Sequence, residues 1–124
     1  MRVGAKTDKG RVREQNEDSY GFKNQLFVVA DGMGGHQAGE IASAIAVTTI
    51  LAMDFEDQVE TELERAIIKA NDAILHEVDQ HPELSGMGTT VATMVLNNRN
   101  VYIAHVGDSR IYHFAGGQLE QLTK

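Results

Sequence analysis

The order of hydrophobic periodicities along the chain is the feature that most constrains its fold. Apolar residues recur every three or four positions over residues 37–53 and 58–80, which predicts two consecutive helices. Shorter runs typical of strands precede and follow these helices, at residues 3–7, 20–22, 26–30, 89–96, 101–106, 110–114 and 119–122. Because tight turns join most neighbouring runs, antiparallel sheets covered by helices fit better than a parallel sheet. The predicted fold class is therefore α+β.

An acid stands where one predicted strand ends, in the stretch VVADGMGGHQAGE. Asp31 is followed by four glycines within eight residues and then by the first predicted helix. A phosphate-binding loop is disfavoured, because Glu40 stands where the P-loop needs lysine and Gln37 occupies the third glycine position of the dinucleotide fingerprint. A metal ligand fits better, since an aspartate at a strand end is held rigidly and glycines let a hard cation approach the backbone. An Asx-turn or a helix cap is the alternative for Asp31 taken alone.

Two further groups of charged residues adjoin predicted strands. Arg13, Glu17 and Asp18 are crowded into the segment RVREQNEDS, and Asp108 follows a strand in a glycine turn. Each group has a plain alternative as a solvated turn, but three acidic sites at strand ends together predict a carboxylate-lined cleft. Carboxylates and water suit Mg²⁺ or Mn²⁺, and a pair of such ions can activate a water for attack at phosphorus. Arg13 is the candidate for holding a phosphoryl group, because its planar fork can make two hydrogen bonds to one.

Composition disfavours several functional classes. The formal net charge is −7 and the 11 Lys and Arg residues are scattered, so binding to a nucleic-acid backbone is not expected. No run of about 18 apolar residues occurs, so a membrane-spanning helix is not expected either. The chain has no cysteine and no apolar leader segment, and a cytoplasmic location is therefore the expectation.

Four motifs resemble those of one known family. They are REQNEDS, VADGMGGHxxGExAS, GMGTT and HVGDSRIY, which begin at Arg13, Val29, Gly86 and His105. In this order they resemble the metal-dependent serine/threonine phosphatases of the protein phosphatase 2C family, particularly the bacterial type. The resemblance implies a sandwich of two antiparallel β-sheets flanked by helices, with a dinuclear Mg²⁺ or Mn²⁺ centre at one end. Residues 1–124 would then be the N-terminal part of a single catalytic domain.

The resemblance also implies a set of metal-binding residues. Asp31 would bridge the two ions, and Gly32 would offer its backbone carbonyl to one of them. Glu17 and Asp18 would bind a metal or metal-held waters. Asp108 would belong to a third, weaker metal site found in bacterial members.

The reaction implied by the resemblance is hydrolysis of phosphoserine or phosphothreonine by a metal-activated water, with Arg13 holding the substrate phosphate. In animal members a histidine that is thought to protonate the leaving group directly follows the Asp-Gly pair. Met33 occupies that place here, as it does in bacterial members, and the nearest histidine is His36. His36 is the candidate general acid, with a surface or helix-start histidine as the alternative.

The resemblance covers only part of the family's domain. Members are about twice as long, and the later Asp-Gly and Asp-Asn motifs that complete the metal centre have no counterpart in residues 1–124. The expectation is a chain that is inactive alone, binds metal weakly and self-associates through unpaired strands. Expected partners are phosphoserine or phosphothreonine proteins and a cognate serine/threonine kinase. The alternative is a non-catalytic, pseudophosphatase-like fragment that binds a phosphoprotein or another protein partner.

Overall fold

The computed structural model describes residues 1–35 and 37–124. Its elements are, in chain order, β1 (Asp18–Lys23), β2 (Leu26–Met33), α1 (Ala38–Leu51), α2 (Val59–Gln80), the 3₁₀ turn η1 (Pro82–Leu84), β3 (Gly88–Thr89), β4 (Val91–Asn97), β5 (Asn100–Val106), β6 (Tyr112–Ala115) and β7 (Gln118–Gln121). The main sheet has the order β1-β2-β4-β5, with β3 pairing with β2, and β6 and β7 form a separate sheet. All pairings are antiparallel. The predicted α+β class with antiparallel sheets is confirmed.

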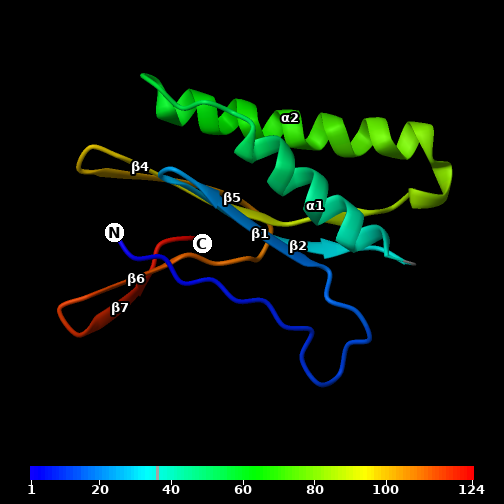
Figure 1. Cartoon of the computed structure of the whole chain (residues 1–124), viewed down its shortest axis with the longest axis horizontal. Helices are drawn as coiled ribbons and strands as arrows, with labels where there is room; N and C mark the ends of the chain where they lie inside the picture. Colours follow the sequence, from blue (N-terminus) through cyan, green and yellow to red (C-terminus); the bar gives the residue numbers. More distant parts are fainter. Residues whose placement is uncertain (36) are drawn as a thin grey trace.

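Both helices lie on one face of the main sheet (Figure 1). Helix α1 packs against β1 and β2 with a face of mostly small residues, which are Ala38, Gly39, Ala42, Ser43, Ala46, Val47 and Ile50. Small side chains let the helix backbone approach the sheet closely. A Cβ atom at Gly32 would collide with the backbone carbonyl of Gly39. This contact fixes the start of α1 directly behind the end of β2.

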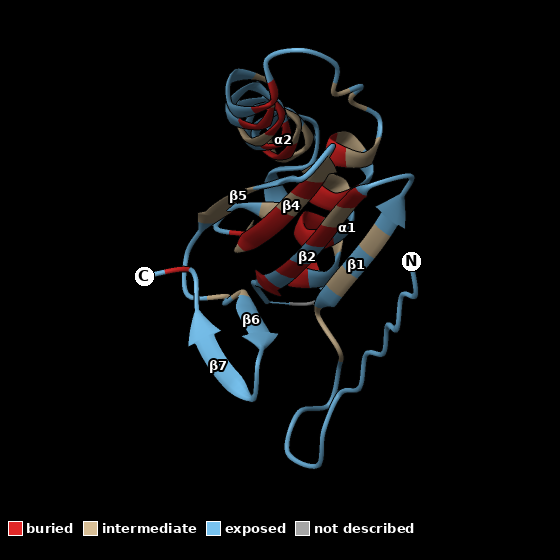
Figure 2. Ribbon diagram, turned by 90° about the vertical axis from the view of Figure 1, so that its left-hand side faces the viewer, coloured by how far each residue is buried: buried red, intermediate tan, exposed pale blue. Residues whose placement is uncertain are grey.

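Helix α2 completes the helical layer. Its buried residues are the core of the predicted apolar stripe, Val59, Leu63, Ala66, Ala70 and Ile74, and the helix contacts α1 and β5. Figure 2 shows the buried residues concentrated between the helices and the main sheet. In the part of the chain that the structure describes, no helix is long and apolar enough to cross a membrane.

The opposite face of the main sheet, here called the outer face, is open. Strand alternation and register place on it the side chains of Tyr20, Phe22, Phe27, Val29, Met94, Val101 and Ile103. Tyr20, Phe22 and Val29 are 43%, 50% and 51% exposed. The N-terminal segment and the β6–β7 hairpin lie on this side of the molecule (Figure 1).

The strand predicted at residues 3–7 is wrong. This segment runs beside Tyr20 and Phe22 and lines a shared cavity with them, but it pairs with no strand among the described residues. A strand needs a neighbour that satisfies its backbone N–H and C=O groups, so an alternating pattern does not make one by itself.

Candidate functional site

Asp18 and Asp31 lie directly opposite each other on neighbouring strands. Asp18 begins β1, Asp31 lies near the end of β2, and the antiparallel register pairs the two residues. Both side chains emerge on the outer face, because residues two apart on a strand share a face and Val29 points that way. The structure therefore brings together two predicted site residues from different motifs.

The pKa of the Asp18 carboxyl is raised above its ordinary value. Partial burial is the largest cause, and the charge of Asp31 and a hydrogen bond between the two carboxyl groups raise the pKa further. The Arg13 guanidinium lowers this pKa, and the Glu17 carboxylate makes a smaller upward contribution. Two carboxylates that disfavour each other's charge form a place where a cation would be stabilised.

A small cavity of about 200 Å³ opens beside this pair. Its walls are formed by Asp8, Lys9, Arg13, Gln15, Asn16, Glu17, Asp18, Asp31 and Gly32. Arg13 is exposed, so its guanidinium is accessible to an anion that enters the cavity. Lys9 is a second cation at the wall that sequence reasoning missed, because it reads as an ordinary turn residue.

Glu17 is held by its backbone. Its carbonyl accepts hydrogen bonds from the Gly32 N–H at 3.1 Å and from the Ser43 hydroxyl at 2.7 Å. Its carboxylate lies against Gly39 at the start of α1. Ser43 is fully buried and also hydrogen-bonds the Ser19 hydroxyl at 2.8 Å, so it ties α1 to the loop that carries Glu17. This anchoring role of Ser43 was not predicted from the sequence. The signal that could have indicated it is a serine on the buried face of a predicted helix.

The donor atoms beside the cavity suit a hard divalent cation. Asp18, Asp31 and the Gly32 carbonyl offer only oxygen, which Mg²⁺ and Mn²⁺ prefer. Across the described part of the chain, however, no three His, Cys, Asp or Glu side chains converge closely enough to hold a metal by themselves. A cation here would therefore rely on the aspartate pair, with the carbonyl and water completing its coordination.

The remaining predicted site residues lie away from this cavity or outside the residues that the structure describes. Asp108 is exposed in the turn after β5 and is not among the residues that line the cavity. Met33, which follows the Asp-Gly pair, is 65% exposed on β2. His36, the candidate general acid, lies outside the described residues.

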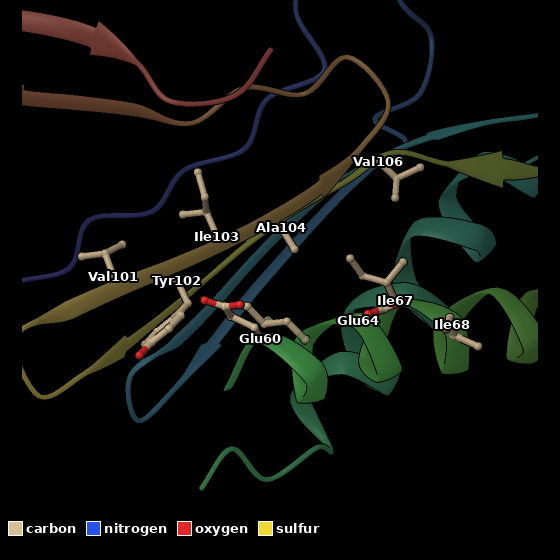
Figure 3. Close-up of a pocket in the computed structure, with 10 residues that line it drawn as sticks. Glu60, Glu64, Ile67, Ile68, Val101, Tyr102, Ile103, Ala104 and Val106 are labelled. Carbon is tan, nitrogen blue, oxygen red and sulfur yellow. The ribbon is translucent and has the colours of Figure 1, made fainter. Parts of the chain in front are cut away.

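A larger groove lies at the other edge of the main sheet. It has a volume of about 590 Å³ and lies between α2 and β5, where Glu60 and Glu64 accompany mostly apolar side chains such as Ile67 and Tyr102 (Figure 3). Strands β2 and β4 separate β5 from the strand that carries Asp18. The groove therefore has no part in the carboxylate site.

Comparison with known families and proteins gives a consistent result. A family model described as Protein phosphatase 2C matches residues 9–124. The serine/threonine protein phosphatase PstP of Mycobacterium tuberculosis is 38% identical over 127 residues, which cover 100% of this chain and 25% of that protein. The serine/threonine phosphatase stp of Listeria monocytogenes is 38% identical over 136 residues, which cover 100% of this chain and 54% of that protein.

Solved structures agree with these sequence matches. The crystal structure of the M. tuberculosis serine/threonine phosphatase PstP/Ppp superposes with a TM-score of 0.90 at 37% identity, over 96% of this chain and 52% of that one. The PstP catalytic domain in complex with 2 manganese ions gives a TM-score of 0.89 at 37% identity, over 96% of this chain and 53% of that one. The chain thus spans between a quarter and about half of the length of these relatives.

Proposed function

Because the chain belongs to the protein phosphatase 2C family, we propose that it forms part of a serine/threonine protein phosphatase that uses Mg²⁺ or Mn²⁺ to hydrolyse phosphoserine and phosphothreonine. The observation that carries this proposal is the pairing of Asp18 with Asp31 beside Arg13. The PstP relative that contains 2 manganese ions supports a dinuclear centre.

In this proposal, the residues of the cavity hold the cations. Asp31, which pairs with Asp18 and precedes Gly32, would be the carboxylate that both ions share. Glu17 contributes through metal-held water, since its own carboxylate is turned toward α1. Asp108 serves a third, weaker site. Bound Mg²⁺ or Mn²⁺ supplies a water of lowered pKa and neutralises charge at the phosphoryl group.

The chain's own residues orient the substrate and maintain the charge of the site. Arg13 binds the phosphoryl oxygens with its guanidinium, which fixes the phosphorus atom opposite the aspartate pair. Asp18 and Asp31 act as deprotonated ligands, a state that a bound cation favours because it removes their mutual repulsion. His36 is the candidate for protonating the leaving oxygen.

We further propose that residues 1–124 bind Mn²⁺ weakly and do not turn over substrate alone. The chain spans about half of the PstP structure, and the resemblance assigns further metal-binding aspartates to the other half. Mn²⁺-dependent hydrolysis of p-nitrophenyl phosphate tests this directly. Turnover that requires both Mn²⁺ and Asp31 would contradict the need for the other half but support the metal centre.

Mn²⁺ binding to the same chain tests the site independently of turnover. Titration of Mn²⁺ should broaden the NMR signals of the Asp31 and Gly32 amides, and Asp31→Asn should abolish this effect. Asp72→Asn, on the exposed face of α2, is the matched control because it removes the same charge elsewhere. Equal broadening in the wild type and in Asp31→Asn would refute the proposed role of Asp31.

A second candidate is a non-catalytic module that binds a phosphoprotein, and the lack of three converging acidic side chains among the described residues favours it. Arg13 and Lys9 would then recognise the phosphate without a metal. Binding of a phosphothreonine peptide that is unchanged by Mn²⁺ and by EDTA would favour this module over the phosphatase. The proposed partners in either case are phosphoserine or phosphothreonine proteins and a cognate serine/threonine kinase.

A further inference from the structure

The hydrogen-bond ladder along β2 is interrupted opposite the candidate metal ligand. Pairing of β2 with β3 and with β4 keeps a single register, which places Asp31 opposite Thr90. A regular antiparallel pair of this kind exchanges two backbone hydrogen bonds. Only one of them has the regular form here, in which the Thr90 N–H donates to the Asp31 carbonyl at 2.9 Å.

The side chain of Thr90 supplies the other hydrogen bond. The Asp31 N–H donates to Thr90 Oγ1 at 3.0 Å, while the Thr90 carbonyl accepts the Thr89 hydroxyl at 2.8 Å instead. Thr90 thus bonds both backbone polar groups of Asp31. Its rotamer decides whether the Asp31 N–H has a partner.

A second hydroxyl fixes that rotamer. Thr90 Oγ1 hydrogen-bonds Ser109 Oγ, in the turn after β5 that also carries Asp108. Thr90 and Ser109 are both half-buried, so water competes for these groups less than it does at the surface. The interaction links the turn after β5 to the end of β2.

We propose that Thr90 is a positioning residue for Asp31, and that its hydroxyl, oriented by Ser109, holds the Asp31 backbone so that the carboxylate stays aligned with Asp18. The inference rests on the proposed function, in which Asp31 binds a divalent cation. An exposed carboxylate on a freely moving backbone samples many directions, and each direction that misses the cation lowers its affinity. Groups that orient a ligand in this way affect metal affinity by about 10- to 100-fold.

The chain offers a matched set of variants. Thr90→Val removes the hydroxyl at nearly constant shape, and Thr90→Ser keeps the hydroxyl. Thr93→Val is the control, because Thr93 Oγ1 donates to the Phe27 carbonyl at 2.9 Å between β4 and β2, away from Asp31. Ser109→Ala removes the hydroxyl that hydrogen-bonds Thr90 Oγ1, and so tests whether Ser109 orients Thr90.

Three measurements are made on each variant of the full 124-residue chain. They are the hydrogen-exchange rate of the Asp31 amide, the Mn²⁺ dissociation constant from paramagnetic broadening at Gly32, and the midpoint of urea unfolding. Thr90→Val should raise the Asp31 exchange rate and the Mn²⁺ dissociation constant by about tenfold or more. Thr90→Ser should restore both values to near those of the wild type, and Ser109→Ala should fall in between. Thr93→Val should lower the urea midpoint but leave both Asp31 readouts unchanged.

The outcomes separate this inference from the function on which it rests. An unchanged Asp31 exchange rate in Thr90→Val, or a Mn²⁺ dissociation constant no higher than that of Thr93→Val, would overturn the positioning role. Failure of Thr90→Ser to rescue would do the same, since the hydroxyl would then not be the active group. If the wild-type chain shows no Mn²⁺ broadening, the proposed metal site fails, and the exchange rates still decide whether Thr90 holds Asp31.

Discussion

Replacing Asp18 by Asn should stabilise the metal-free chain at neutral pH, although Asp18 belongs to the candidate site. Asp18 faces Asp31 across β1 and β2 and shares a hydrogen bond with it, and two unit charges about 4 Å apart repel by about 1 kcal/mol in water. Arg13 offsets part of this repulsion and solvent screens the exposed side chains, so the net gain should be about 0.5 kcal/mol. That gain corresponds to a rise of about 2 °C in Tm for a domain of this size.

The raised pKa of Asp18 fixes the direction of the pH dependence. Below the ordinary pKa of 3.8 the carboxyl is protonated in both the folded and the unfolded chain, so it has no effect on the free energy of unfolding. Between this value and the raised pKa, the folded state binds more protons than the unfolded state, so the wild type loses stability as the pH rises. The gain from Asp18→Asn should therefore grow over this interval and stay constant above it.

Thermal unfolding in EDTA at a series of pH values measures this effect. Asp72→Asn is the control, because it changes the net charge by the same amount on the exposed face of α2. An Asp18→Asn variant that melts at or below the wild-type temperature at neutral pH would refute the reasoning, as would a gain that Asp72→Asn matches. With added Mn²⁺ the wild type should melt at a higher temperature than Asp18→Asn, since the wild type binds the ion better and is stabilised more by it.

Two further predictions concern packing and self-association. Gly32→Ala should lower the free energy of unfolding by about 2 kcal/mol, because the added Cβ collides with Gly39. Gly35→Ala is the control and should change this free energy by less than about 0.5 kcal/mol, because Gly35 has open space around it. Equal urea midpoints for the two variants would contradict the close contact of α1 with β2. The chain should also self-associate through the outer face, where Phe22 and Val29 are 50% and 51% exposed. Sedimentation should then show species that grow with concentration and diminish in Phe22→Ser, and a monomer at every concentration would show that this face does not associate.

Much of the fold could be predicted because the relevant patterns are local. The stripe of α2 is visible in the sequence and is the stripe that is buried. The turn between β4 and β5 is also determined by local sequence. Asn98 takes a φ of 57° there, which asparagine tolerates better than most residues. The absence of a strand at residues 3–7 could not be predicted, because the same alternating pattern occurs whether or not a partner strand is available.

The break in the ladder at Thr90 was equally hidden. The run at residues 89–96 has the composition of one continuous strand, and the structure divides it into β3 and β4 on either side of Thr90. The division arises because a threonine hydroxyl replaces a backbone carbonyl as the acceptor for Asp31. Threonine favours a strand whether its hydroxyl or its backbone carbonyl accepts the hydrogen bond, so the sequence does not show the break. Only the position of Asp31 opposite Thr90 in the folded chain reveals it.

The acid that faces Asp31 is decided by a single turn residue. A loop of residues 23–25, as the sequence suggests, would pair residue 22 with residue 26 and place Glu17 opposite Asp31. In the structure Lys23 pairs with Leu26, which shortens the loop to two residues and places Asp18 there instead. Asn24 permits this loop by adopting a φ of 56°. Because a shift of one residue reverses the faces of a strand, the same turn directs the Glu17 carboxylate toward Gly39 and the helix. The acidic residues of the site are therefore visible in the sequence, but which of them faces Asp31 depends on the turn at the far end of the β1–β2 hairpin.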